Sequence, residues 1–347
     1  MSSTEVVAAA EAATGTGTAD EGELQAFLQK TSRTFALTIP MLPARLRREI
    51  GVAYLLFRVI DTFEDATAWP PARRMEALEE FVAMLEEDGA GAGPRSIRAV
   101  AEAWTREPPV AHQGYIELLG ATPRVLDWYR GLAPASRREL RRHVAESARG
   151  MKRFVERTDA NGVLRLQTVD DLHDYCFVVA GLVGQMLTEL FVLGDPRIAA
   201  RADELRARAV RFGEALQLVN ILKDAGQDQV EGRLYLPEAV PLAEVFMLAR
   251  ADLQAAAEYC EILRAAGADR GLVAFNAVNA TLAFSTLRLV RDRGPGAKLT
   301  RPQVVGIVAG VMHAIDHGAP LFDPADHPAG SASSRRPTNG EADRSPR

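Results

Sequence analysis

The stretch from Tyr54 to Asp65 constrains the fold of this chain more than any other. It is an apolar run that ends in three carboxylates, those of Asp61, Glu64 and Asp65. With about 100° of rotation per residue in an α-helix, Asp61 and Asp65 stack one turn apart beside Arg58, within an arc of roughly 60°. The remaining faces are apolar, which is typical of a buried helix. Because carboxylates in an apolar interior are costly unless they are paired or bind metal, the stretch predicts a functional site.

A second acidic helix is predicted over residues 217–228. Asn220, Asp224 and Asp228 lie within about 80° of arc, and leucine, isoleucine and valine supply the other faces. Either acidic stretch alone is most simply explained as a solvated helix face. Two of them, each on an apolar helix and each beside a cation (Lys223 in this stretch), favour a single site between two facing helices.

Composition indicates an all-α protein. The chain has 347 residues, of which 47% are hydrophobic, 25% charged and 6% aromatic, and it lacks alternating runs bounded by Asn-Gly or Asp-Gly. A net charge of −5 argues against nucleic-acid binding. Cys176 and Cys260 lie far apart, which favours reduced thiols in a cytosolic protein.

The ends of the chain differ in composition from the middle. We expect disordered tails at residues 1–21 and 318–347, with one helical domain over residues 22–317. No apolar run of 18 uncharged residues and no signal peptide is evident, so we predict a cytoplasmic protein without a transmembrane segment, monomeric or weakly dimeric. Gly181 and Gly184 interrupt a predicted helix, where they permit close approach of either another helix or a ligand.

The oxygen-rich carboxylate clusters predict a particular chemistry. Hard oxygen ligands select Mg²⁺ or Mn²⁺, and Mg²⁺ is commonly shared with a substrate phosphate. Facing clusters therefore suit a diphosphate, with the remaining phosphate charge taken by Arg33, Arg58, Lys223 and Arg233. Aliphatic walls around the rest of the cavity suit ionisation of an allylic diphosphate to a carbocation away from water.

Four motifs, taken together, resemble the squalene/phytoene synthase family, and the likeness runs from about residue 24 to 240. The motifs are Ser32-Arg33-Thr34-Phe35, Tyr54-x-x-x-Arg58-x-x-Asp61-Thr62-Phe63-Glu64-Asp65, Tyr175-Cys176-x-x-Val179-Ala180-Gly181-Leu182-Val183-Gly184 and Gln217-x-x-Asn220-Ile221-x-x-Asp224-x-x-x-Asp228. Their form is more similar to squalene synthases than to phytoene synthases. The resemblance implies a single-domain isoprenoid-synthase fold with a central cavity and head-to-head condensation of two prenyl diphosphates.

The resemblance also implies roles for individual residues. Those expected to bind Mg²⁺ and diphosphate are Asp61, Glu64, Asp65, Asp224 and Asp228. Those expected to contact substrate or metal-bound water are Ser32, Arg33, Phe35, Arg58, Gln217, Asn220, Lys223 and Arg233. Tyr54 and Tyr175 would lie by the cationic centre, Tyr175 as a proton carrier or cation stabiliser. A squalene synthase would pass through presqualene diphosphate and reduce it with NADPH.

Two positions depart from the family pattern. Gln227 stands where the second acidic motif usually has Glu, and Lys223 replaces the usual Arg and loses its bidentate fork. The family resemblance leaves several activities open. Squalene formation is the leading hypothesis, and siblings that make presqualene diphosphate, dehydrosqualene, hydroxysqualene or phytoene are alternatives. Three alternatives lie outside this family: a head-to-tail prenyltransferase, a terpene cyclase and a non-catalytic helical assembly factor. A lipid product would also favour peripheral membrane contact.

Overall fold

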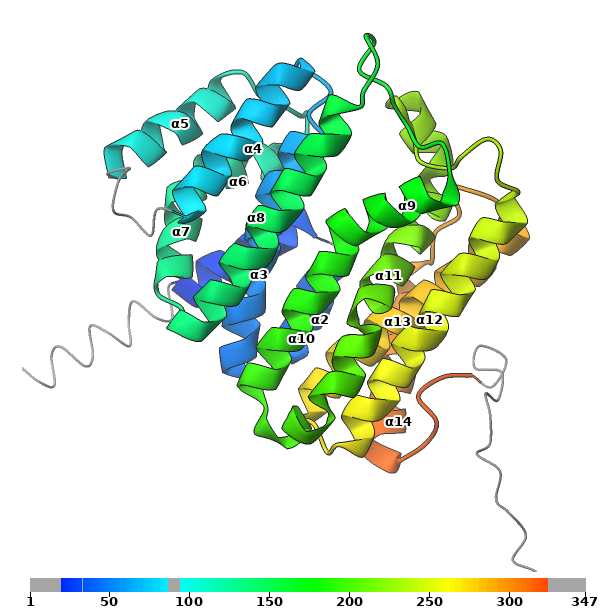
Figure 1. Cartoon of the computed structure of the whole chain (residues 1–347). Coiled ribbons are helices and arrows are strands. Elements are labelled where there is room, and N and C mark those ends of the chain that lie inside the picture. Colours follow the sequence, from blue (N-terminus) through cyan, green and yellow to red (C-terminus); the bar gives the residue numbers. More distant parts are fainter. Residues whose placement is uncertain (1–19, 33, 87–93, 324–347) are drawn as a thin grey trace, which may run out of the picture.

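The computed structural model describes residues 20–32, 34–86 and 94–323, and these are helical almost throughout (Figure 1). The elements of the first half are a helix over residues 20–31, α2 (Phe35–Thr38), η1 (Ile39–Met41), α3 (Ala44–Glu64), α4 (Pro71–Glu86), α5 (Pro94–Arg106), α6 (Gln113–Gly120), α7 (Thr122–Arg130) and α8 (Pro134–Glu156). The elements that follow are β1 (Leu164–Arg165), α9 (Val169–Cys176), η2 (Phe177–Gly181), α10 (Leu182–Gly194), η3 (Pro196–Arg201), α11 (Ala202–Val230), β2 (Arg233–Leu234), α12 (Leu242–Ala265), α13 (Arg270–Arg293) and α14 (Arg301–His317). The predicted all-α class is confirmed.

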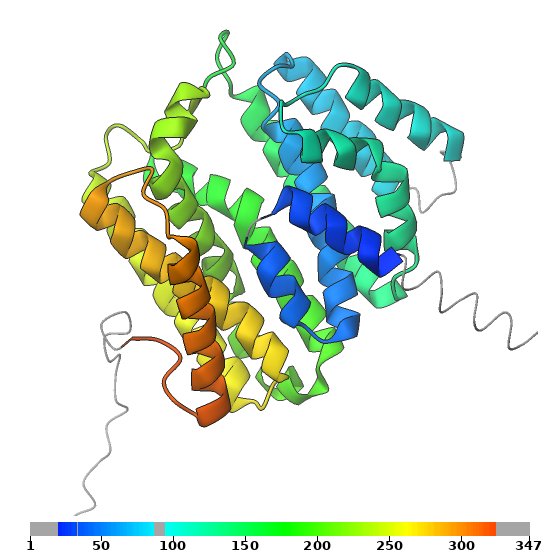
Figure 2. The same cartoon turned by 180° about the vertical axis from the view of Figure 1, so that it is seen from behind.

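Helix α3 lies at the centre of the molecule, as its apolar sequence predicts. Leu55, Leu56 and Phe57, which point in directions about 100° apart, are 0%, 0% and 6% exposed. Helices α4, α6, α7 and α8 pack on one side of α3 and α10 packs on another (Figure 1). Helix α11 in turn packs against α10, α12 and α13, so the two acidic helices belong to opposite halves of the bundle. From behind, α2 lies between these halves, and the 20–31 helix lies on the α3 side, where the Phe27 ring is 6.4 Å from that of Trp128 on α7 (Figure 2).

Helices α10 and α11 cross closely because both carry glycine at the crossing. A Cβ on Gly184 would lie 2.0 Å from the carbonyl oxygen of Ala209, and a Cβ on Gly213 would lie 2.0 Å from that of Ala180. No side chain fits at these distances. Of the two explanations considered for Gly184, close helix packing therefore holds, and it draws α11 against the wall of the central cavity.

The two strands found among the described residues are two residues long and were not predicted. Leu164 pairs with Arg233 and Arg165 with Leu234, in parallel. This pairing ties the loop after α8 to the loop after α11. Its consequence for function is local, since it fixes the backbone that carries Arg233.

The ordered domain extends slightly beyond its predicted limits at both ends. Residues 20 and 21 are already helical. At the other end the structure describes the chain to residue 323, with Leu321 and Phe322 buried and the Phe322 ring 5.8 Å from that of Phe284. The rest of both predicted tails lies outside the described residues.

Two helical segments are long and apolar enough to cross a membrane by length and composition, which the sequence prediction did not anticipate. They are Val169–Gly194 and Arg270–Arg293, and 44% and 72% of their apolar windows are buried. Core helices of a globular fold meet the same criterion. Whether the protein contacts a membrane therefore stays a prediction.

Candidate active site

A cavity of about 660 Å³ opens between α3, α11 and the segment before α2. Its lining contains every predicted site residue except Arg33, which lies outside the described residues. The predicted residues that line it are Ser32, Phe35, Tyr54, Arg58, Asp61, Glu64, Asp65, Tyr175, Gln217, Asn220, Lys223, Asp224, Asp228 and Arg233. The structure thus brings both acidic stretches to one cavity, although more than 150 residues separate them in the chain.

Arg233 joins the two carboxylate clusters. Its Nη1 lies 3.2 Å from Asp65 Oδ1 on the α3 side, and its Nη2 lies 3.2 Å from Asp228 Oδ1 on α11. Nη2 also pairs with Glu231. A guanidinium can bridge two carboxylates because its donors point in fixed, separate directions. The clusters are therefore held face to face by a shared cation, and the raised pKa of Arg233 follows from these carboxylates, which outweigh its burial.

Burial raises the pKa of two carboxylates of α3, those of Asp61 and Glu64. Glu64 is 4% exposed, and burial, with repulsion from Asp65, raises its pKa to about 8. Burial also raises the pKa of Asp61 to about 6, although Arg58 Nη1, 3.5 Å from Asp61 Oδ2, opposes the shift. Asp228 on α11 likewise has its pKa raised to about 6, chiefly by burial. Carboxyl groups whose ionised form is destabilised by burial are the ones that a bound cation stabilises most.

Arg58 is held between two aromatic rings. Its guanidinium carbon lies 5.6 Å from the ring centre of Tyr54 and 5.2 Å from that of Tyr115. The Tyr54 hydroxyl donates to the Thr31 carbonyl at 2.7 Å, which fixes one of the rings. Among the residues that the structure describes, the buried Nε of Arg58 has no hydrogen-bond partner. This arrangement holds a positive charge at the cavity wall. Tyr115 lies outside every motif recognised in the sequence.

Tyr175 belongs to a buried hydroxyl pair rather than acting alone. Its hydroxyl donates to the Tyr235 hydroxyl at 2.7 Å, and the two rings stack with centres 4.5 Å apart. Glu64 Oε1 lies 3.5 Å away, at the limit of a hydrogen bond. Burial, followed by the nearby Glu64 charge, raises the pKa of both tyrosines well above its ordinary value. Both therefore stay protonated near neutral pH. Tyr235 was missed, although its loop was recognised.

The outer residues of the site are more open to solvent. Lys223 Nζ lies 2.7 Å from Asp224 Oδ2, and their side chains are 22% and 36% exposed. Ser32 Oγ accepts from the backbone N–H of Phe35 at 2.9 Å, so it orders the turn into α2 as well as lining the cavity. Gln227, the second departure from the family pattern, donates to Glu231.

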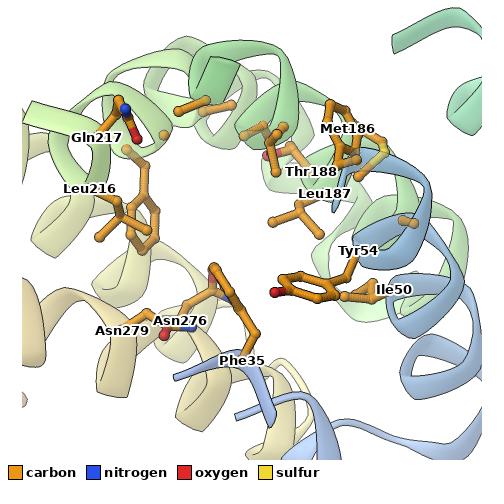
Figure 3. Close-up of a pocket in the computed structure, with 18 of the residues that line it drawn as sticks. Phe35, Ile50, Tyr54, Met186, Leu187, Thr188, Leu216, Gln217, Asn276 and Asn279 are labelled. Carbon is orange, nitrogen blue, oxygen red and sulfur yellow. The ribbon is translucent and has the colours of Figure 1, made fainter. Parts of the chain in front are cut away.

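The polar cavity continues into an apolar pocket of about 220 Å³. Phe35, Tyr54 and Gln217, labelled around the apolar pocket in Figure 3, line both parts. Beyond them the pocket lies between α3, α10, α11 and α13, and its walls include Ile50, Met186, Leu187, Phe191, Phe212, Leu216 and Phe275. A charged mouth that leads to an apolar interior suits a molecule with an anionic head and a hydrocarbon tail.

The donor set fits Mg²⁺ shared with a substrate rather than a preformed metal centre. Within the part of the chain that the structure describes, no group of three or more His, Cys, Asp or Glu side chains could hold an ion by itself. Oxygen ligands from both clusters nevertheless line the same cavity. Mg²⁺ keeps several waters and is bound through one or two carboxylates plus substrate phosphates, so an incomplete set of this kind is what it requires.

A third acidic motif was overlooked in the sequence. Asp170, Asp171 and Asp174 have the D-D-x-x-D spacing of head-to-tail prenyltransferases. The structure uses it differently: Asp171 lies in the first turn of α9, accepts from the Gln167 N–H at 2.9 Å and pairs with Arg157 at 2.8 Å. These aspartates are absent from the lining of the cavity described above.

Comparison with known proteins agrees with this geometry. The family model described as Squalene/phytoene synthase matches residues 28–269. Among curated proteins, a squalene synthase of Schizosaccharomyces pombe is 29% identical over 216 residues, which cover 61% of this chain and 43% of that protein. Squalene synthase BSS of Botryococcus braunii is 31% identical over 212 residues, covering 60% and 41%. The chain thus spans less than half the length of these relatives.

Solved structures show the same fold. A ligand complex of TcSQS superposes with a TM-score of 0.65 at 25% identity, covering 85% of this chain and 86% of that one. A dehydrosqualene synthase superposes with a TM-score of 0.56 at 20% identity, covering 86% and 97%. The second likeness shows the fold alone.

Proposed function

Because the chain belongs to the squalene/phytoene synthase family, and is therefore a prenyltransferase, we propose that it condenses two farnesyl diphosphates head to head through presqualene diphosphate. In this proposal the final product with a hydride donor is squalene. One observation carries it: two carboxylate clusters, bridged by Arg233, stand at the mouth of an apolar pocket.

The residues of the mouth would bind and ionise the diphosphate head. Mg²⁺, when bound, would neutralise diphosphate charge and stabilise it as a leaving group, with Asp61, Asp65, Asp224 and Asp228 as its protein ligands. Arg58, Lys223 and Arg233 would contact the outer phosphate oxygens. Since Arg58 already lies against two rings, its charge is positioned before substrate arrives.

The residues below the mouth would guide the carbocation. The apolar walls exclude bulk water, which would otherwise capture an allylic cation early. The faces of Tyr54 and of the stacked pair Tyr175 and Tyr235 offer electron-rich surfaces toward positive charge. The Tyr175 hydroxyl donates to Tyr235, so within this protonated pair the Tyr235 hydroxyl is the one that can donate toward the leaving diphosphate.

NADPH enters the proposal through family resemblance. The described residues hold two strands of two residues each, so a strand, glycine loop and helix of the Rossmann type is not found among them. In the proposal the reductant enters through the same open cavity as the substrate.

The experiment that tests the proposal is product analysis. The purified chain is incubated with farnesyl diphosphate and Mg²⁺, with and without NADPH, and products are identified by mass spectrometry. Squalene that forms only with NADPH supports the full proposal. A C30 product that NADPH leaves unchanged would move the assignment to the dehydrosqualene or hydroxysqualene siblings.

If no product forms, the assay is repeated with the C20 prenyl diphosphate that phytoene synthases use. No turnover of either substrate would contradict the proposal and favour a non-catalytic assembly factor. The five acidic residues retained at the cavity, Asp61, Glu64, Asp65, Asp224 and Asp228, argue for catalysis.

We also propose that the protein is cytoplasmic, monomeric or weakly dimeric, and touches membranes peripherally. Exposed apolar side chains support the last point, since Met247 is 66% and Val305 is 67% exposed. Flotation with lipid vesicles tests membrane contact, and sedimentation tests the oligomeric state. A protein that stays with the soluble fraction at all lipid concentrations would contradict peripheral binding.

A further inference from the structure

Two amides of α13 make one wall of the apolar pocket polar, away from its mouth. Asn276 and Asn279 line the pocket and are 4% and 5% exposed. They are three residues apart on a helix, so their side chains share a face. Figure 3 shows them side by side on one wall, across the cavity from Leu187. Buried amides on the wall of a hydrocarbon pocket are unusual, because each carries groups that require hydrogen bonds.

Hydrogen bonds within the protein account for only part of what these amides offer. Asn276 Nδ2 donates to the Leu272 carbonyl at 2.9 Å. Asn279 Nδ2 donates to the Phe275 carbonyl at 2.9 Å and to Thr38 Oγ1 at 3.3 Å. An amide side chain has two N–H donors and one oxygen acceptor. Beyond these bonds, one N–H of Asn276 and the amide oxygens of both asparagines have no hydrogen-bond partner among the described residues. They are available to bond a molecule in the pocket.

Thr188, on the wall formed by α10, differs from the amides. Thr188 Oγ1 bonds to the Gly184 carbonyl at 2.9 Å and to the Tyr259 hydroxyl at 2.9 Å. Its hydroxyl is therefore satisfied within the protein. Gln217 and Asn220 also line the polar cavity, so away from the mouth the polar groups with capacity left are those of Asn276 and Asn279 on α13.

A water molecule suits the remaining groups. Buried waters typically make two to four hydrogen bonds to polar groups that the protein leaves unsatisfied. The two amide oxygens can each accept a hydrogen from one water, which leaves an oxygen lone pair of that water directed into the pocket. The pocket, at about 220 Å³, is large enough to hold a water beside a hydrocarbon chain.

We propose that Asn276 and Asn279 hold a water in the apolar pocket that captures the C30 carbocation. In the absence of a hydride donor, the chain then releases mainly a C30 alcohol rather than a dehydro hydrocarbon. This inference rests on the proposed head-to-head condensation and adds the residues that decide how its cation is quenched.

The step balances without an oxidant or a reductant. A lone pair of the held water forms a carbon–oxygen bond to the cationic carbon. The oxonium proton passes to inorganic diphosphate, the base that ionisation has just released. The competing reaction is loss of a proton from carbon, which gives an alkene, so the two outcomes are distinguished by whether oxygen is retained.

The test compares the product ratio of matched variants in assays with farnesyl diphosphate and Mg²⁺ but no NADPH. Asn276→Leu and Asn279→Leu keep the approximate side-chain volume and remove the amide. The control is Thr281→Val on the same helix, whose hydroxyl bonds to the Ala277 carbonyl at 2.7 Å and does not line the pocket. We expect the ratio of C30 alcohol to dehydro hydrocarbon to fall at least about tenfold in the asparagine variants and to stay unchanged in the control.

The results that would overturn the inference are distinct from those that would overturn the condensation. If the wild-type protein makes C30 hydrocarbon or presqualene diphosphate but no alcohol, the held water is wrong and the condensation stands. An unchanged ratio in folded asparagine variants has the same meaning. If the wild-type protein forms no coupled product, the condensation fails and the inference fails with it.

A second measurement does not depend on the variants folding. A high-resolution crystal structure of the unmodified protein is expected to show an ordered water within about 3.2 Å of the amide oxygens of Asn276 and Asn279. A dry wall at these two residues would overturn the inference.

Discussion

The carboxylate clusters of α3 and α11 are similar in sequence, yet the protein surrounds them differently. On α3, Glu64 is 4% exposed and burial raises its pKa to about 8. On α11, the Asp224 side chain is 36% exposed and pairs with Lys223 at 2.7 Å. Glu64 is thus held where its charged form is costly, whereas Asp224 stays partly exposed at the mouth; Asp228 of α11, 14% exposed and with its pKa raised to about 6 chiefly by burial, resembles the α3 side. The comparison teaches that the surroundings of each carboxylate, rather than the motif it belongs to, set its electrostatics.

Removal of one carboxylate from either cluster gives the largest expected effect. Asp61→Ala and Asp224→Ala should each lower turnover of farnesyl diphosphate roughly 10³-fold, because each removes charge that holds the Mg²⁺ diphosphate complex. Circular dichroism should show unchanged helix content. Asp127→Ala is the control, since this 62% exposed side chain pairs with Arg130 on α7. Normal turnover in either site variant would show that its cluster is dispensable.

Removal of the bridge between the clusters comes next. Arg233→Met should lower kcat/KM roughly 10²-fold, because Asp65 and Asp228 lose the cation that lies 3.2 Å from each. Arg165→Met, on the paired strand, is the control, since its Nη1 bonds to the exposed Glu238 instead. Equal kinetics for both variants would mean that the clusters do not depend on the bridge.

The buried cluster predicts a pH dependence of stability. Glu64 has a pKa of about 8 in the folded protein and an ordinary value of 4.5, so between these values only the folded state keeps the proton. The stability that this proton contributes is complete below pH 4.5 and is lost as pH rises through 8. Thermal unfolding should therefore show a flatter fall of Tm over this range for Glu64→Gln than for wild type. The control is Glu76→Gln, whose side chain is 61% exposed, and its Tm should follow the wild-type curve. If the Tm curves of all three proteins run parallel, the raised pKa of Glu64 is refuted.

The tyrosine pair below the α3 cluster predicts a smaller effect. Tyr235→Phe leaves the buried Tyr175 hydroxyl without its acceptor at 2.7 Å. A lost partner of this kind is worth about 1–3 kcal/mol, so we expect kcat to fall about tenfold with little change in KM. Tyr129→Phe, whose hydroxyl bonds to the Arg137 carbonyl outside the cavity, serves as control. If kcat is unchanged in Tyr235→Phe, the Tyr235 hydroxyl does not contribute to catalysis.

A conservative substitution of Lys223, on the more exposed side of the site, should have the smallest effect on activity. Lys223→Arg restores the residue usual in the family, keeps the positive charge beside Asp224 and stays partly solvated. We expect kcat/KM to change by less than about threefold. A much larger change in steady-state kinetics would show that this side of the site is as tightly constrained as the α3 side.

Helical periodicity was sufficient to predict much of the site. The spacing of Asp61 and Asp65, and that of Asp224 and Asp228, placed each pair on one face, and apolar neighbours predicted burial of the helices. Helical spacing and the polarity of neighbouring residues are local properties, so they can be predicted from the sequence. The facing of the two helices was inferred from the repeated pattern, and the cavity lining confirms it. Arg33 remains a prediction.

The residues that sequence analysis missed depend on tertiary structure. Tyr115 reaches Arg58 only because α6 packs against α3. Tyr235 meets Tyr175 because two short strands pair between distant loops. Asn276 is one polar residue in an apolar helix, and no spacing rule shows which way it faces. Contacts of this kind are fixed by how helices dock, which a single sequence does not record.

The most direct test of the central claim asks whether the two clusters form one site. Release of inorganic diphosphate from farnesyl diphosphate is measured for Asp61→Ala, Asp224→Ala and the double variant, with Mg²⁺ present. If both aspartates act on one metal-bound diphosphate, the double variant should be no slower than the slower single variant, because either change already disables the shared site. Losses that multiply in the double variant would contradict the account, since they would mean that the two clusters act independently.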